Sequence, residues 1–179
     1  GMTMVIISTG IDLSVGSLIA LSSMCASVFI RDIGGGVEAS LLMMLCGCLL
    51  GIAVCAFSGS FVGVMVTAFK VPPFIVTLAF MLMARGVALR LGDGQSINAL
   101  PDSISWFGAR DTLAIPHQVI LMVVLYIIAH FVMSKTVFGR HVYAIGGNAE
   151  AARLSGIRVN RTLIIVYTIC GALAGLGGV

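Results

Sequence analysis

The feature that most constrains this chain is the length of its stretches without Asp, Glu, Lys or Arg. These stretches cover 13–30, 39–69, 71–84, 112–134 and 162–179. A membrane-spanning helix needs about 20 mainly apolar residues, and a charge at its centre costs about 2.5–3.5 kcal/mol on insertion scales. The chain is therefore predicted to have an all-α fold, a polytopic transmembrane helix bundle. The five expected membrane segments lie near 2–30, 41–66, 71–91, 117–134 and 162–179.

The composition indicates that the chain is surrounded by a lipid bilayer. Apolar residues make up 59% of its 179 residues and charged residues only 9%, whereas soluble domains carry about 25% charged residues. This excludes a soluble globular domain and a disordered chain. A net charge of +3 is too small and too scattered for a nucleic-acid partner. The five cysteines lie in apolar runs, so we interpret them as packing residues and expect no metal site.

The distribution of Lys and Arg predicts the orientation in the membrane. The segment 135–161 holds a single acid, Glu150, and its basic residues are Lys135, Arg140, Arg153, Arg158 and Arg161. Because cytoplasmic loops are enriched in Lys and Arg, we expect this segment inside the cell. Alternation then places the turn at Lys70 inside, and the loops 31–40 and 92–116 outside. The charged residues of the latter loop, which agree with this, are Asp93, Asp102, Arg110 and Asp111.

The first membrane segment contains a polar sequence, Gly10–Ser17 (GIDLSVGS), that should break its helix. Two glycines weaken helical propensity by about 1 kcal/mol each, and Asp12 or Ser14 can cap the helix that restarts there. Broken helices at membrane depth line cavities or are buried in protein, and in transporters they often build the substrate site. Asp12 and Ser14 are therefore either capping residues or part of a translocation path.

The second apolar stretch is longer than one span requires. Ser58, Gly59 and Ser60 lie within it, which favours a kink or a break of the helix there. Pairs of glycines four residues apart also occur, and such spacing lets helix backbones approach closely in lipid. These pairs are Gly47 and Gly51, Gly59 and Gly63, and Gly171 and Gly175.

Arg85 interrupts the third apolar stretch. If a helix starts at Pro73, Arg85 lies about 18 Å along it, beyond the middle of a hydrocarbon core about 30 Å thick. An arginine there reaches outward to the membrane surface, pairs with a carboxylate, or faces a polar cavity. We therefore include Arg85 with Asp12 and Ser14 among the candidate residues of a translocation path.

The basic segment contains the pattern of a short, delimited helix. Asn148 is a good N-cap, Glu150 favours the positive N-terminal end, and Gly156 is a typical C-terminal stop. A helix of two turns is marginal alone in water. It therefore needs a surface to dock on, either its own bundle or a soluble partner, unless it is an ordinary loop helix.

Motifs for catalysis and nucleotide binding are absent from the sequence. There is no GxxxxGK[ST], GxSxG or HExxH, so we expect no enzyme activity and no nucleotide site on this chain. The sequence starts without the basic region of a signal peptide and stops within an apolar pattern. We therefore expect a single membrane domain over 1–179, incomplete at both ends.

Several blocks of sequence together point to a known family. In chain order, they are Gly1–Ile6 (GMTMVI), Gly10–Ser17, Pro73–Leu78 (PFIVTL), Arg85–Gly86, Phe138–Arg140 (FGR), Tyr143–Asn148 (YAIGGN), Ala151–Ile157 (AARLSGI) and Gly171–Gly175 (GALAG). In these blocks and their order the chain resembles the permease subunits of bacterial ABC importers for sugars, of the ribose, arabinose, xylose and galactoside type. The resemblance covers the whole chain and corresponds to the middle of such a permease.

The resemblance implies a subunit that passes a monosaccharide or a similar small polar solute into the cytoplasm across the bacterial inner membrane. It implies a separate cytoplasmic ATPase that uses ATP and Mg, a second permease subunit, identical or similar, and a periplasmic solute-binding protein. It implies no catalytic residue and no cofactor on this chain. Within a cytoplasmic coupling loop, 135–161, the implied ATPase-coupling residues are Asn148, Ala149, Glu150, Ala151, Ala152, Arg153, Leu154, Ser155 and Gly156.

Two other classes of function stay open at the level of sequence. One is an ion-coupled secondary transporter, in which Asp12 and Arg85 would be the ion-linked groups. The other is a membrane scaffold that transports nothing. Among importers, nucleosides and autoinducers are solutes that related permeases with the same pattern could carry.

Overall fold

The computed structural model describes residues 1–95, 97, 101, 111–112 and 115–179. The α-helices of this part are α1 (Met2–Ile7), α2 (Val15–Asp32), α3 (Leu41–Ala68), α4 (Pro73–Leu91), α6 (His117–Lys135), α7 (Val137–Gly147), α8 (Ala149–Leu154) and α9 (Val159–Leu176). A single turn of 3-10 helix, η1, covers Gly36–Glu38, and a two-stranded antiparallel ribbon pairs β1 (Asp111–Thr112) with β2 (Ile115–Pro116). Apart from this ribbon the described fold is all-α, as predicted.

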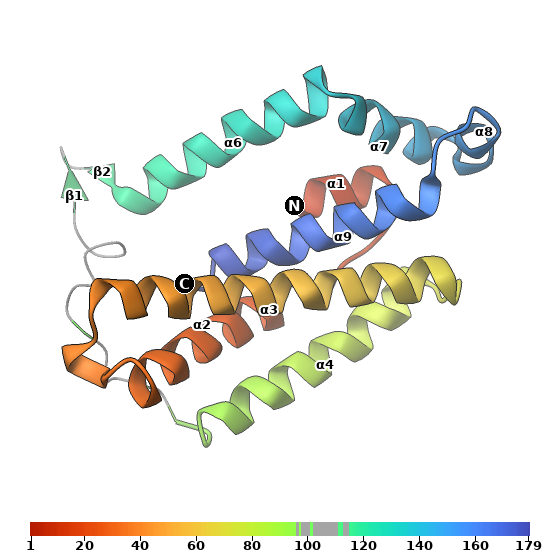
Figure 1. Ribbon diagram of the computed structural model, residues 1–179. Helices are drawn as coiled ribbons and strands as arrows, with labels where there is room; N and C mark the ends of the chain where they lie inside the picture. The colour runs from red at the N-terminus through yellow and green to blue at the C-terminus, as the bar shows by residue number, and fades with distance from the viewer. Residues whose placement is uncertain (96, 98–100, 102–110, 113–114) are drawn as a thin grey trace.

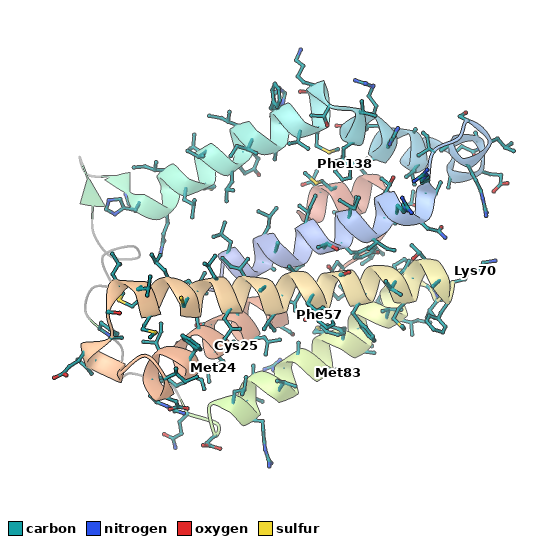
Figure 2. All side chains as sticks on the ribbon, in the orientation of Figure 1. Met24, Cys25, Phe57, Lys70, Met83 and Phe138 are labelled. Atoms are coloured by element: carbon teal, nitrogen blue, oxygen red, sulfur yellow. The ribbon has the colours of Figure 1, made fainter. Side chains whose placement is uncertain are left out.

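Five helices of the described residues are long and apolar enough to cross a membrane: α2, α3, α4, α6 and α9. They correspond to the five predicted segments, and most ends agree within a few residues. The exception is the first segment, predicted from residue 2, whose span-length helix begins at Val15. Their outer faces carry large apolar side chains. Phe57 on α3 is 74% exposed and Met83 on α4 is 61% exposed (Figure 2). This surface fits a hydrocarbon environment rather than water.

The bundle is organised around the contact between α3 and α9, which lie side by side (Figure 1). Their backbones approach so closely that glycine is required on both. A Cβ atom at Gly59 would overlap the carbonyl group of Tyr167, and one at Gly171 would overlap the carbonyl group of Cys55. The glycine spacing in the sequence therefore correctly predicted a close helix contact.

The predicted kink or break at Ser58–Ser60 is wrong, because α3 continues without interruption from Leu41 to Ala68. The Ser58 hydroxyl donates to the carbonyl oxygen of Val54 at 2.8 Å, within the helix itself. Gly59 faces α9. Of the three residues that suggested a break, Ser58 thus bonds within the continuous helix and Gly59 packs against α9.

The predicted break at Gly10–Ser17 is confirmed, but the chain also reverses its direction there. The helix stops after Ile7 and restarts at Val15, and Figure 1 shows α1 and α2 running in opposite directions along α9. Gly1 lies against Cys170 in the second half of α9. The first predicted segment is therefore two elements, of which α2 alone has the length of a span. We call residues 8–14 the reversal.

The buried apolar residues form two hydrophobic clusters. The first joins α1, α3, α7 and α9, and its buried residues are Met4, Val5, Val62, Val142, Val166, Tyr167 and Cys170. The second joins α2, α3, α4 and α9, and its buried residues are Leu18, Leu21, Cys55, Ala84, Ala88 and Ala174. Cys55 and Cys170 are buried in these cores, as the sequence predicted, whereas Cys46 is exposed and the packing role predicted for it is wrong. In both clusters α9 and α3 supply residues, so the two cores share one scaffold.

Helix α6 stands apart from this scaffold along most of its length (Figure 1). No residue of α6 is buried, whereas α7, which follows it after Thr136, buries Gly139, Val142 and Ile145. Only the later part of α6, at Ala129 and Met133, packs on the first hydrophobic cluster. Helix α7 thus anchors α6 to the bundle.

We predict that Gly59→Ala destabilises the complete protein, because the added methyl group pushes α3 away from α9. Overpacking of this kind costs about 1–3 kcal/mol. The measurement is the midpoint of thermal unfolding in detergent. The matched control is Gly86→Ala on α4, where an added Cβ meets nothing within 4 Å. Equal midpoints for the two variants would contradict the proposed role of the α3–α9 contact.

Candidate functional site: the buried reversal and the α8 end

The reversal contains a buried carboxylate. Asp12 is only 3% exposed, and its Oδ1 accepts hydrogen bonds from the Ser14 backbone N–H at 2.9 Å and from the Ser14 hydroxyl at 2.6 Å. Ser14 is itself 1% exposed. Hydrogen bonds to a charged acceptor are stronger than neutral ones and offset part of the cost of burial. The two residues that the sequence singled out are therefore directly bonded to each other.

The predicted capping of α2 is wrong in its detail. Ser14 occupies the N-cap position of α2, but neither its side chain nor that of Asp12 bonds to a backbone N–H of the first turn. Asp12 instead binds Ser14, immediately before the helix. Its carboxylate closes a local turn across two residues, an arrangement typical of Asp in loops. Asp12 thus shapes the reversal, and the position of α2 follows from it.

Polar groups from neighbouring helices converge on the reversal. The Thr77 hydroxyl on α4 lies 3.3 Å from the carbonyl oxygen of Ile11 and 2.9 Å from that of Pro73, so it can donate to either. Gly10 lies against the Tyr167 side chain, near the middle of α9. The Tyr167 hydroxyl is buried and has no hydrogen-bond partner among the described residues. The reversal is therefore partly buried: Ser8, Asp12 and Ser14 face the protein interior, where irregular backbone is tolerated, whereas Thr9 and Ile11 are exposed.

Arg85 is not part of this polar region. It lies on the exposed side of α4, while Ala84 and Ala88 face the bundle. Among the residues that the structure describes, the only ion pair joins Arg31 to Asp32, so Arg85 is not paired with a carboxylate there. Arg85 lies six residues before the end of α4, about 9 Å along the axis. The structure brings Asp12 and Ser14 together and leaves Arg85 apart from them.

The predicted short helix is present as α8. The Asn148 Oδ1 accepts hydrogen bonds from the backbone N–H groups of Glu150 and Ala151, both at 3.0 Å. Gly156 has a φ of +85°, the left-handed conformation that favours glycine after a helix. The N-cap and the C-terminal stop are therefore confirmed.

Helix α8 projects from the end of the bundle and exposes most of its surface (Figure 1). Ala152 is 5% exposed and faces inward, whereas Leu154 is 83% exposed. Glu150 and Arg153 are also exposed. An apolar side chain this exposed, flanked by charges at the tip of a short helix, is suited to contact another protein.

Helix α7 was not predicted, although its sequence carried a signal for it. The Thr136 hydroxyl oxygen accepts a hydrogen bond from the Gly139 backbone N–H at 3.3 Å, which starts the helix. Val142 and Ile145 are buried, and Arg140 and Tyr143 are exposed. This is an amphipathic helix pattern, masked in the sequence by the many glycines around it.

The two ends of the bundle differ in charge, as the distribution of Lys and Arg among the loops predicted. The turn after α3, which holds Lys70, lies at the same end as α8 (Figure 2). The α2–α3 loop and the turn at 92–95 lie at the opposite end (Figure 1). Asp102 and Arg110, which entered the prediction for the 92–116 loop, lie outside the described residues. The alternation of ends is confirmed, and which end faces the cytoplasm stays a prediction.

Comparison with known proteins decides the family. A family model described as "Branched-chain amino acid transport system / permease component" matches residues 1–179. The chain belongs to this permease family. With its span-length helices, it is part of a multi-pass membrane protein.

Among curated relatives, the ribose import permease protein RbsC of Escherichia coli K12 is 41% identical over 100% of this chain and 54% of its own length. The inner membrane ABC transporter permease protein YjfF of the same strain is 38% identical, over 100% of this chain and 53% of its own. The fructose import permease protein FruF of Bifidobacterium longum is 35% identical, over 99% of this chain and 49% of its own. The chain spans about half the length of these relatives. No solved structure matches it.

We predict that the reversal needs a hydrogen-bond acceptor at position 12 rather than a charge. Asp12→Asn keeps an oxygen at Oδ1 and should unfold near the wild-type midpoint. Asp12→Ala removes both bonds to Ser14 and should cost about 1.5–3 kcal/mol. The measurement is thermal unfolding of the complete protein in detergent. If Asp12→Asn is as unstable as Asp12→Ala, the negative charge itself holds the reversal.

Proposed function

We propose that the complete protein is the permease subunit of an ATP-binding-cassette importer in the bacterial inner membrane. It passes a monosaccharide or a similar small polar solute into the cytoplasm. The observation that carries this proposal is the match of the whole chain to permeases named for ribose and fructose import. A sugar is favoured over an amino acid, in spite of the family's description, because these relatives are named for sugars.

The partners follow from this class of transporter. A cytoplasmic ATPase uses ATP and Mg to drive the cycle, a second permease subunit, identical or similar, completes the pathway, and a periplasmic solute-binding protein delivers the solute. The chain itself binds no cofactor, no nucleotide and no nucleic acid, and performs no covalent chemistry. Its 179 residues form a single membrane domain, with 135–161 as the cytoplasmic coupling loop.

The coupling residues are those of α8 with its cap and stop, Asn148 to Gly156. The ATPase contacts the exposed side of α8, including Leu154, and displaces it when ATP binds. Helix α9 starts close behind α8 at Val159, so it moves with α8. Tyr167 on α9 contacts both the α3 backbone and the reversal. The displacement therefore reaches the polar region around Asp12 and Ser14, which we place on the translocation path.

Arg85 has no supported place on this path. Its exposed position on α4 fits an arginine that reaches the membrane surface along the helix. The ion-coupled secondary transporter also has no support from the geometry, because its two expected ion-linked groups, Asp12 and Arg85, are not paired. Uptake that an uncoupler abolishes in the absence of any ATPase would restore that alternative.

The first test is co-purification of the complete protein, tagged and extracted in mild detergent. We expect a cytoplasmic ATPase in stoichiometric amount, because α8 needs a soluble partner on its exposed side. A permease that stays folded without bound ATPase would contradict the proposal.

A second prediction concerns α8. Three single variants weaken this helix. Asn148→Ala removes its N-cap, Glu150→Ala removes the acid in its first turn, and Gly156→Ala disturbs its left-handed stop. We expect uptake in proteoliposomes to fall about tenfold while ATP hydrolysis continues, since coupling energies of about 1.4 kcal/mol correspond to that factor.

The matched control for these variants is Gly147→Ala. Gly147 precedes the same helix, but an added Cβ meets nothing within 4 Å and its φ is not left-handed. This variant should transport as the wild type does. Normal uptake by the Gly156→Ala variant would contradict the coupling role of α8.

A further inference from the structure

The turn between α3 and α4 faces α8 and α9 across a hollow at the end of the bundle. The hollow has a volume of about 380 Å³, and among its lining residues are Lys70, Pro72 and Pro73 on one side and Arg153 and Asn160 on the other. A second hollow of about 330 Å³ lies beside it. Arg153 and Asn160 line both, so the two form one continuous surface.

This surface carries an excess of positive charge. Its cations are Lys70, Arg153, Arg158 and Arg161, and its acid is Glu150. No ion pair joins any of these five in the part of the chain that the structure describes. Four cations against one anion favour an acidic occupant, and arginine in particular binds carboxylates through two parallel hydrogen bonds.

The backbone at Lys70 adds an independent observation. Lys70 has a φ of +53°, a conformation that is uncommon for residues other than glycine and costs about 1–2 kcal/mol. Pro72 and Pro73 follow it and fix the backbone of the next residues. The turn that carries Lys70 is therefore held in a defined conformation at the edge of the hollow.

We propose that the Lys70 side of this basic surface, on the α3–α4 turn, is a second docking point for the ATPase beside the exposed side of α8, and that it receives an acidic side chain of the ATPase surface. This inference rests on the proposed function. The size of the hollow fits a few side chains rather than a folded element, so the occupant projects from the partner. Arg153 belongs to α8 and also lines the hollow, so the two docking points lie next to each other.

A docking point at Lys70 has a direct structural connection to the reversal. Thr77 lies one helical turn after Pro73 on α4, and its hydroxyl lies within hydrogen-bond distance of the carbonyl oxygens of both Pro73 and Ile11. Movement of the α3–α4 turn is therefore transmitted to the residue next to Asp12. The ATPase acts on the polar region from two sides, through α9 and through α4.

The test uses the complete permease in nanodiscs of phosphatidylcholine, with binding of the purified ATPase as the readout. Lys70→Asn removes the charge and keeps the backbone, because asparagine tolerates left-handed φ. We expect it to weaken ATPase binding about threefold to tenfold at low salt. The difference should shrink at about 0.5 M salt, where charges are screened. Lys70→Arg keeps the charge and should bind within about twofold of the wild type.

The matched control is Lys135→Asn, the same substitution at an exposed lysine at the end of α6, which lies outside the coupling residues 148–156 and does not line the hollow. It should bind the ATPase as the wild type does. Thermal unfolding of all variants checks that each is folded. Equal low-salt affinity of the Lys70→Asn variant and the wild type would overturn the docking point.

Three further outcomes would also overturn it. If Lys70→Asn has an effect only when the nanodiscs contain about one third phosphatidylglycerol, the occupant is an anionic lipid headgroup rather than the ATPase. If the wild type binds no ATPase at all, the proposed function fails and this inference fails with it. If Gly156→Ala weakens ATPase binding but Lys70→Asn does not, the second docking point is wrong and the proposed function stands.

Discussion

The backbone contact between α3 and α9 is the constraint on which the rest of the structure depends. In lipid there is no hydrophobic effect to drive helices together, so close packing of small residues has to supply the attraction. Gly59 and Gly171 allow each helix to reach a carbonyl group of the other. Both hydrophobic clusters use residues from this pair. Helices α1, α2, α4 and α7 are arranged around it.

The same scaffold makes a buried polar reversal possible. Irregular backbone between two helices, here residues 8–14, would be costly against lipid. Here α9 covers Gly10, α4 places a hydroxyl near Ile11, and Asp12 bonds to Ser14. Under the proposed function, a displacement of α9 reaches this polar region directly, because Gly10 lies against Tyr167.

The end of the molecule that carries α8 and Lys70 combines one feature that could be predicted from the sequence with one that could not. The α8 cap and stop are local features, because Asn148 and Gly156 act within a few residues of themselves, and they were predicted correctly. Lys70 was seen only as a charge in a turn. It lies 83 residues before Arg153 in the chain, and only the fold places both on one hollow.

The sequence by itself determined the all-α class, the five spans, the break at Gly10–Ser17 and the charge difference between the two ends. These follow from apolar run length, glycine content and charge, which act locally or through the bilayer. Tertiary structure alone decided that α3 continues without a break through Ser58–Ser60, that the chain reverses after Ile7, and that Arg85 stays apart from Asp12. Each of these depends on which helix packs against which face, and the contacts that choose the partner join residues far apart in the chain.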